Sequence, residues 1–183
     1  MLKEYGIIRK IACLVLIMFC CMLCVDVAHA APSSKKVKKA YMKQVKKVYN
    51  KGNKRHTMYK MHDFNKDGVK ELVVAQAAGA RGNYYVYTYR KGKVVKLNKK
   101  TYNEIGRLKG TKYIVGLLSG GSAGNVYEVF AIKGKKLKLV ARYISEYNYD
   151  TDEVHRYKND QFITLEKYNK FVNRIQYFDM KEY

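Results

Sequence analysis

The sequence predicts a mainly β fold of the α+β class: two repeated three-stranded antiparallel units packed together, with an N-terminal amphipathic helix and a C-terminal helix. Three observations predict it. The 183 residues include 18 tyrosines, no tryptophan and one proline, a composition that suits half-buried, pleated strands. A strand pattern recurs with an offset of 42 residues. Apolar residues recur at helical spacing in the two flanking segments.

Residues 1–30 have the anatomy of a secretory signal peptide. Three basic residues precede the apolar run 11–25, and the small-x-small sequence at 28–30 is a cleavage site. The run is shorter than the roughly 20 apolar residues that usually span a bilayer. We therefore expect a secreted, extracellular protein that begins at Ala31, with association with the cell wall as a further expectation. An uncleaved membrane anchor is the alternative.

The composition of the remaining chain limits its chemistry and its partners. All four cysteines lie inside the predicted signal peptide, so the mature chain has no disulfide, no thiol nucleophile and no zinc–thiolate site. Removing three basic and two acidic residues changes the formal net charge from +22 to +21. So basic a chain is expected to associate with a polyanionic surface or cell-wall component, without specific recognition of nucleic acid. The alternative is that the charge serves solubility alone.

Residues 31–55 are expected to form a basic amphipathic helix and a linker. Ser33 and Ser34 can cap a helix over 34–49, and Gly52 is a suitable terminator. The apolar stripe at helical period consists of Val37, Ala40, Tyr41, Val45, Val48 and Tyr49. The lysines on the remaining surface are Lys36, Lys39, Lys43, Lys46 and Lys47. Two interpretations fit: the helix lies on an anionic surface, or it docks on the β domain with its lysines solvated.

The β-rich domain is expected to span 56–183 and to contain two 42-residue repeats, about 71–112 and 113–154. Segments 71–74, 82–87 and 91–93 align without gaps with 113–116, 124–129 and 133–135. Each unit is predicted as strand, glycine-rich loop, strand, Lys-Gly turn and strand. Two units cannot close a propeller, so we expect two packed sheets. The glycine-rich loops at 77–82 and 119–124 are the best candidates for a binding face.

A helical cap is expected to close the C-terminal part. Short strands are predicted near 142–149, 154–157 and 161–163, with a hairpin turn at Asn159-Asp160. Thr164 can cap a helix that runs through about Arg174, with Glu166 placed favourably in its first turn. The apolar face of that helix consists of Tyr168, Phe171, Val172 and Ile175.

The segment before the first repeat has the spacing of a calcium loop. The predicted ligands are the side chains of Asp63, Asn65, Asp67 and Glu71 and the backbone carbonyl of Val69. Ca²⁺ takes six to eight oxygens at about 2.3–2.6 Å, and alternate residues of one tight turn can supply them. Gly68 permits the sharp bend. The alternative is an acidic turn whose side chains accept hydrogen bonds from their own backbone.

Two comparisons within the sequence define this loop further. Counted from Asp63, the twelfth residue is Val74, where an EF-hand places a bidentate glutamate, so Glu71 must supply that carboxylate. When the repeat alignment is extended backwards, Gly68 matches Gly110. The three leading ligands then face Ile105, Arg107 and Lys109. The turn therefore does not itself require these oxygens, which favours a metal.

This spacing resembles the D-x-[DN]-x-D-G-x-x-[DE] loops of FG-GAP and integrin-type propeller repeats. Followed by strands with a Lys-Gly turn, it also looks like small secreted proteins of Gram-positive bacteria with unassigned function. The resemblance implies that the loop binds Ca²⁺ in a structural role. The chain departs from the family in having two repeats, of which one carries ligands, so a propeller is not implied.

The rest of the sequence contains no motif for catalysis. No His-Glu-x-x-His or phosphate-binding loop occurs, and His62 beside Asp63 is interpreted as a packing residue. The acidic residues 150, 152 and 153 are interpreted as a solvated turn. We therefore expect a non-enzymatic, calcium-binding module for cell-surface binding or adhesion. The alternatives are a polycation that binds wall teichoic acid or extracellular nucleic acid, and a glycan-active hydrolase.

We expect the signal peptide to be removed on export. Intact mass of the protein from culture supernatant should correspond to a chain that starts at Ala31, because the small-x-small sequence ends at Ala30. Recovery of the full-length chain in the membrane fraction alone would contradict cleavage.

Overall fold

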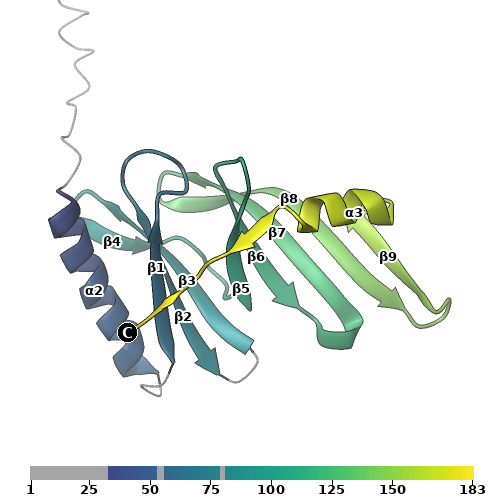
Figure 1. Cartoon of the computed structure of the whole chain (residues 1–183), viewed down its shortest axis with the longest axis horizontal. Helices are drawn as coiled ribbons and strands as arrows, with labels where there is room; N and C mark the ends of the chain where they lie inside the picture. The colour runs from purple at the N-terminus through teal and green to yellow at the C-terminus, as the bar shows by residue number, and fades with distance from the viewer. Residues whose placement is uncertain (1–32, 53–55, 79–80) are drawn as a thin grey trace, which may run out of the picture. The chain divides into compact units, whose positions relative to one another are not determined.

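The structure is a computed structural model that describes residues 33–52, 56–78 and 81–183. The predicted signal peptide lies outside these ranges, and so do residues 79–80 of the first glycine-rich loop. The described chain is mainly β, with two antiparallel sheets and a helix near each end (Figure 1), which confirms the predicted fold class. No helix in these ranges is long and apolar enough to cross a membrane.

The first sheet has five antiparallel strands in the order β12-β1-β2-β3-β4. Their bounds are β1 Thr57–His62, β2 Glu71–Ala78, β3 Arg81–Arg90, β4 Lys93–Lys96 and β12 Lys181–Glu182. Strands β2, β3 and β4 are consecutive neighbours, as predicted for the first unit. The turn between β3 and β4 is Lys91-Gly92, with φ of 49° and 77°. Positive φ at both central residues is the geometry of a two-residue hairpin turn.

The second sheet has seven antiparallel strands in the order β10-β9-β8-β7-β6-β5-β11. Their bounds are β5 Glu104–Leu108, β6 Tyr113–Ser119, β7 Gly124–Lys133, β8 Lys136–Asn148, β9 Glu153–Lys158, β10 Gln161–Phe162 and β11 Ile175–Tyr177. Strands β6, β7 and β8 follow one another as the second predicted unit does. The second glycine-rich loop contains the short 3-10 helix η1, Gly121–Ala123. Asn159 and Asp160 form the predicted hairpin turn, with φ of 49° and 65°.

The N-terminal helix α2, Ser34–Lys51, docks on the five-stranded sheet. The Ser33 hydroxyl caps it by accepting from the Lys36 N–H. Its four buried residues are Val37, Tyr41, Val45 and Val48, and they pack on Leu72, Val74, Tyr87 and Tyr89 of the sheet. The docking interpretation is therefore correct. The apolar stripe is covered, and the lysine face remains solvent-exposed.

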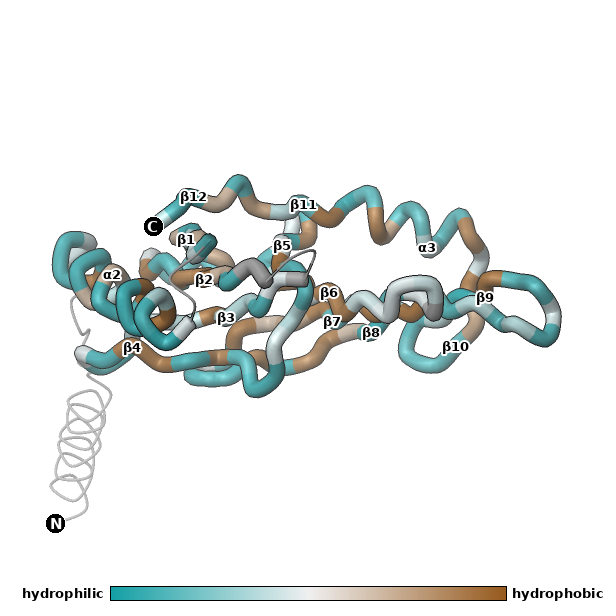
Figure 2. Tube along the Cα trace, turned by 90° about the horizontal axis from the view of Figure 1, so that it is seen from below, coloured by the Kyte–Doolittle hydropathy of each residue, from teal (hydrophilic) through white to brown (hydrophobic). Residues whose placement is uncertain are grey.

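A second core lies between the two sheets. Val73 and Val86 of the five-stranded sheet contribute to one cluster with Ile105, Ile114 and Phe130 of the seven-stranded sheet. Phe64, Leu97 and Tyr102 complete its buried members. Figure 2 shows the hydrophobic character of β6 and β7, which supply much of this core. The described residues from 33 onward belong to one compact unit.

The C-terminal helix α3, Leu165–Val172, covers the other face of the seven-stranded sheet. Thr164 caps it as predicted, accepting from the Lys167 N–H at 3.3 Å. Phe171 stacks on Tyr143 with ring centroids 3.6 Å apart, and the Tyr168 hydroxyl donates to Ser145. These contacts anchor the helix as a cap on the sheet.

The helix ends at Val172, two residues before the predicted end at about Arg174. The prediction that Ile175 belongs to its apolar face is wrong, because Ile175 begins strand β11. The Arg174 N–H donates to the Phe171 carbonyl, an i→i−3 bond that tightens the last turn. The chain then continues through β11 in one sheet to β12 in the other, so this segment joins the two sheets (Figure 1).

The backward extension of the repeat alignment is also wrong. Ile105 and Arg107, which were aligned with loop residues, lie in β5 and pair with Gly116 and Ile114. The connection equivalent to loop 63–70 is 109–112, because these segments join β1 to β2 and β5 to β6. Gly68 and Gly110 both have left-handed φ, 84° and 76°. The candidate metal loop is therefore the longer of two comparable connections.

Candidate functional site

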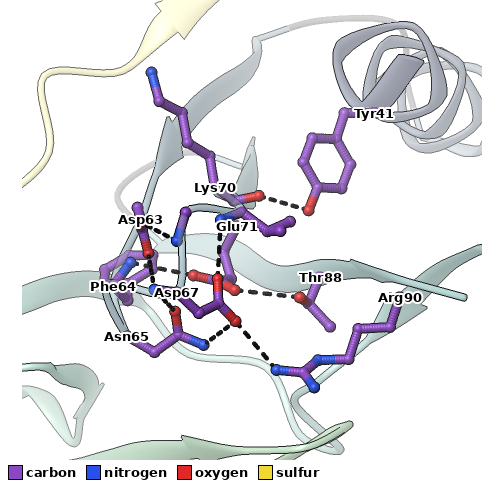
Figure 3. Close-up of polar contacts among 11 residues, drawn as sticks. Tyr41, Asp63, Phe64, Asn65, Asp67, Lys70, Glu71, Thr88 and Arg90 are labelled. Atoms are coloured by element: carbon purple, nitrogen blue, oxygen red, sulfur yellow. Dashed lines mark hydrogen bonds and ion pairs between the residues drawn. The ribbon is translucent and has the colours of Figure 1, made fainter. Parts of the chain in front are cut away.

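The candidate calcium loop joins β1 to β2 at one end of the five-stranded sheet. Two of its residues have left-handed φ, Lys66 at 59° and Gly68 at 84°. Glycine adopts this conformation without steric cost. The Tyr41 hydroxyl of α2 donates to the Lys70 carbonyl at 2.7 Å, which attaches the end of the loop to the helix (Figure 3).

The side-chain oxygens of alternate loop residues turn back onto the loop backbone. The Asp63 carboxylate accepts from the N–H groups of Asp67 and Gly68, at 3.2 and 3.0 Å. The Asn65 amide oxygen accepts from the same Asp67 N–H at 3.1 Å. The Asp67 carboxylate accepts from the Val69 N–H at 2.9 Å. Figure 3 shows these side chains converging within one turn.

Glu71 is a fully buried carboxylate at the base of this turn, with 0% of its surface exposed. Its two oxygens accept from the Phe64 N–H at 3.1 Å and from the Thr88 hydroxyl at 3.2 Å. The pKa of Glu71 is raised to about 7, mainly by burial. The hydrogen bonds from Phe64 and Thr88 offset part of this rise, and the negative charges of Asp67 and Asp63 add to it. The fold thus holds three carboxylates close enough to repel one another.

A basic side chain already compensates part of this charge. The Arg90 guanidinium donates to the Asp67 carboxylate at 3.2 Å, and the Asn65 amide donates to the same oxygen at 2.8 Å. Both members of the ion pair are about one-third exposed, so solvent screening leaves the pair weak. Arg90 would compete with a metal ion for Asp67.

The five predicted ligands therefore lie in one loop and differ in their surroundings. Asp63, Asn65 and Asp67 converge on the loop backbone, Val69 is half-buried beside them, and Glu71 points into the sheet. Among the described residues, no three His, Cys, Asp or Glu side chains are grouped closely enough to form a metal site as they stand. The backbone-bonded acidic turn is present, and calcium binding stays a prediction.

These residues are nevertheless compatible with a bound cation. An ionised carboxylate has about four lone-pair positions. Asp63 uses two of them for backbone N–H groups, and Glu71 uses two for Phe64 and Thr88. The oxygens therefore retain acceptor capacity while the backbone bonds fix their positions.

Three residues that contact the loop are not indicated by the sequence pattern. Tyr41 belongs to the apolar stripe of α2, and Thr88 and Arg90 lie on β3, distant in sequence from the loop. The signal that could have identified them is strand pairing, because β2 and β3 are hydrogen-bonded neighbours. Residues that follow Tyr87 on β3 must then lie beside Glu71, because Tyr87 pairs with Leu72.

Three other sequence candidates make local contacts in the structure. The His62 ring packs edge-on against Phe64 at 5.1 Å, and burial lowers its pKa, with the Arg107 charge as the next cause. The turn at 150–153 is exposed, and the Asn148 amide oxygen accepts from the N–H groups of Asp150 and Thr151. In the second glycine-rich loop, the Gly120 N–H donates to the Gly124 carbonyl.

Comparisons with known proteins find no matching family model, no matching curated protein and no matching solved structure.

We expect the stability of the calcium-free protein to fall as pH rises through the titration of Glu71. The pKa of Glu71 in the folded protein, about 7, exceeds the ordinary glutamate value of 4.5, so folding favours the protonated carboxyl group. The favourable contribution of protonated Glu71 to the free energy of unfolding is fully present below pH 4.5 and is lost as pH rises through 7. At 1.36 kcal/mol per pKa unit the loss is about 3 kcal/mol. Urea unfolding of calcium-free protein at successive pH values measures it.

Glu71→Gln is the matched variant for this prediction. Its amide oxygen can accept from the Phe64 N–H and its amide nitrogen can donate to the Thr88 oxygen, so the buried bonds are kept without a charge. The difference in unfolding free energy between wild type and Glu71→Gln should therefore change with pH over this interval. A difference that stays constant with pH would contradict the assignment.

Proposed function

We propose that this protein is a secreted, calcium-stabilised module for cell-surface binding or adhesion, with a non-enzymatic role. The observation that carries the proposal is the convergence of Asp63, Asn65 and Asp67 in one turn with the buried Glu71 at its base. Carboxylate repulsion and the burial of Glu71 both oppose this arrangement, and the partly exposed Arg90 offsets only part of that cost. The signal-peptide anatomy of residues 1–30 supports export to a compartment in which calcium is plentiful.

The loop supplies the hard oxygen chemistry that calcium prefers. Asp63, Asn65, Asp67 and Glu71 would hold the ion with their side chains, and Val69 with its carbonyl. When bound, calcium supplies positive charge to the three carboxylates. Lys66 and Lys70 flank them and the domain is strongly basic, which supports weak binding, on the order of 10⁻⁴–10⁻³ M as in other extracellular modules.

Calcium should stabilise the folded protein. An ion that binds only the folded state stabilises it by RT ln(1 + [L]/Kd), which is about 1.4 kcal/mol at tenfold excess over Kd. For a domain of this size the melting temperature should rise by roughly 3–6 °C. Thermal melts in millimolar calcium and in chelator measure the rise, and magnesium should give a smaller one because it demands tighter octahedral geometry.

Three variants make this test specific. Asp67→Ala should abolish the calcium response because it removes a charged ligand. Arg90→Gln should enlarge the response because it removes the positive charge 3.2 Å from that ligand. Asp150→Ala, the same change in the exposed turn after β8, should respond as wild type does. If calcium raised the melting temperatures of wild type and Asp67→Ala equally, the loop would be an acidic turn that does not bind calcium.

A second candidate function is binding to polyanions such as wall teichoic acid. The observation that favours it is the lysine face of α2, defined here as Lys36, Lys39, Lys43, Lys46 and Lys47, which is solvent-exposed while the opposite face is docked. Docking places the backbone of these lysines on one face of the domain. A fixed array of positive charges attracts polyanions and releases their counterions.

Polyanion binding should depend steeply on salt. The logarithm of the association constant for DNA should fall linearly with the logarithm of salt concentration, with a slope of about −0.9 per neutralised phosphate. The triple variant Lys43→Glu, Lys46→Glu, Lys47→Glu should weaken binding and flatten this slope. Fluorescence anisotropy over a salt series measures both quantities.

The matched control is Lys133→Glu, Lys135→Glu, Lys136→Glu, which changes the net charge equally in the exposed turn between β7 and β8. It should lose less affinity than the helix variant. Equal losses would show that the total charge acts, with no special role for α2. An affinity that does not change with salt would contradict electrostatic binding altogether.

A further inference from the structure

A second set of charged residues surrounds a pocket of about 480 Å³ at the rim of the inter-sheet core. Lys60 and His62 enter it from β1 of the five-stranded sheet, and Arg107 enters from β5 of the seven-stranded sheet. Gln176, Tyr177, Phe178 and Asp179, in the segment that joins β11 to β12, complete the lining. Both sheets and their connecting segment thus contribute to one hollow.

The walls of this pocket are held in place by packing and by a hydrogen bond. Phe178 packs on His62 and Phe64, with ring centroids 5.8 and 5.3 Å apart. The Arg107 Nε donates to the Gln176 side-chain oxygen at 2.9 Å, across a pair of facing strand residues. β11 approaches this closely because Gly106 has no side chain: a Cβ there would lie 2.8 Å from the Gln176 carbonyl oxygen.

The pocket carries more positive than negative charge. Lys60 and Arg107 are cationic, and Asp179 is the one carboxylate in the lining. Within the described residues, no ion pair joins Lys60 or Arg107 to any carboxylate. The bond to Gln176 engages the Nε of Arg107, so its two terminal amino groups are available to an anion. A guanidinium binds carboxylate and phosphate groups through such paired donors.

We propose that this pocket binds one anionic sugar unit, a hexose that carries a carboxylate or a phosphate, as part of a surface glycan. Arg107 and Lys60 bind the anionic group. The Phe178 and His62 rings give the sugar ring an apolar surface, and Asp179 and Gln176 accept hydrogen bonds from its hydroxyl groups. Asp179 repels a second negative charge, which favours a singly substituted sugar over a polyphosphate.

This proposal deepens the proposed surface-binding role by naming the class of ligand, and it rests on that role for its biological setting. It does not depend on calcium, because none of the pocket residues is a predicted metal ligand. The pocket is also separate from the lysine face of α2, because that helix covers the opposite side of the five-stranded sheet from the inter-sheet core.

Titration of the purified protein with defined sugars, followed by NMR chemical shifts, tests the proposal. Glucuronate or glucose 6-phosphate should bind at least tenfold more tightly than glucose or inorganic phosphate. Arg107→Gln should weaken this binding at least tenfold, and Arg107→Lys should weaken it less, because it keeps the charge and loses the paired donors. Lys109→Gln, an equivalent loss of charge in the next turn, should have no effect.

Each other outcome overturns the proposal. If glucose bound as tightly as the sugar acids, Lys60 and Arg107 would not contribute to recognition. If inorganic phosphate bound as tightly, the pocket would recognise the anion without the sugar. Undetectable binding of both sugar acids, or undiminished binding by Arg107→Gln, would exclude the pocket. Titrations in calcium and in chelator separate this result from the calcium loop, since the loop can respond to calcium in melts while the pocket fails to bind sugar.

Discussion

The burial of the Glu71 carboxylate is the constraint on which the first half of the structure depends. A buried carboxylate requires hydrogen-bond donors on each oxygen, and it obtains them from the Phe64 backbone and the Thr88 hydroxyl. The first bond ties the loop to the start of β2, and the second ties β2 to β3 beyond the last paired residues, Leu72 and Tyr87. Tyr41 then attaches α2 to the following carbonyl. The buried Glu71 carboxyl group thus links the loop to strands β2 and β3, and the adjacent Lys70 carbonyl links it to α2.

The inter-sheet core gives the second constraint. Both sheets use one face for a helix and the other face for this shared core, so each strand of the central region is covered on both sides. At the rim of the shared core, Lys60 of one sheet and Arg107 of the other line one pocket, and neither forms an ion pair with a carboxylate in the described part of the chain. The pocket at Lys60 and Arg107 is a consequence of that junction, because no single sheet brings those residues together.

The local elements of this fold could be predicted from the sequence, and the pairings between distant segments could not. Helical period and capping residues predicted α2 and the start of α3, and glycine turns predicted the consecutive strands of each unit. The end of α3 was missed because Ile175 continues the apolar spacing of the helix while its backbone pairs with Leu108 of β5. The short strand β12 contains only Lys181 and Glu182, which show no apolar alternation.

The loop of the candidate site could likewise be predicted from the sequence, and the residues that surround it could not. Oxygen spacing identified the loop, since the predicted ligands lie within nine consecutive residues, 63–71. The partners that surround Glu71 were hidden because they come from α2 and β3 through tertiary packing. The pocket was hidden for the same reason: Lys60, Arg107 and Phe178 are far apart in sequence, and each has an ordinary local context.

The pairing of Met58 with Glu182 has a consequence for the order of folding. β1 lies beside β2 on one side, and its other edge has no partner until the segment around residue 182 is available. Until β12 pairs with it, the unpaired edge of β1 can form hydrogen bonds with strands of other chains. Contacts so distant in sequence also form slowly. A polypeptide synthesised from its N-terminus therefore completes its first sheet only after its last residues have been made.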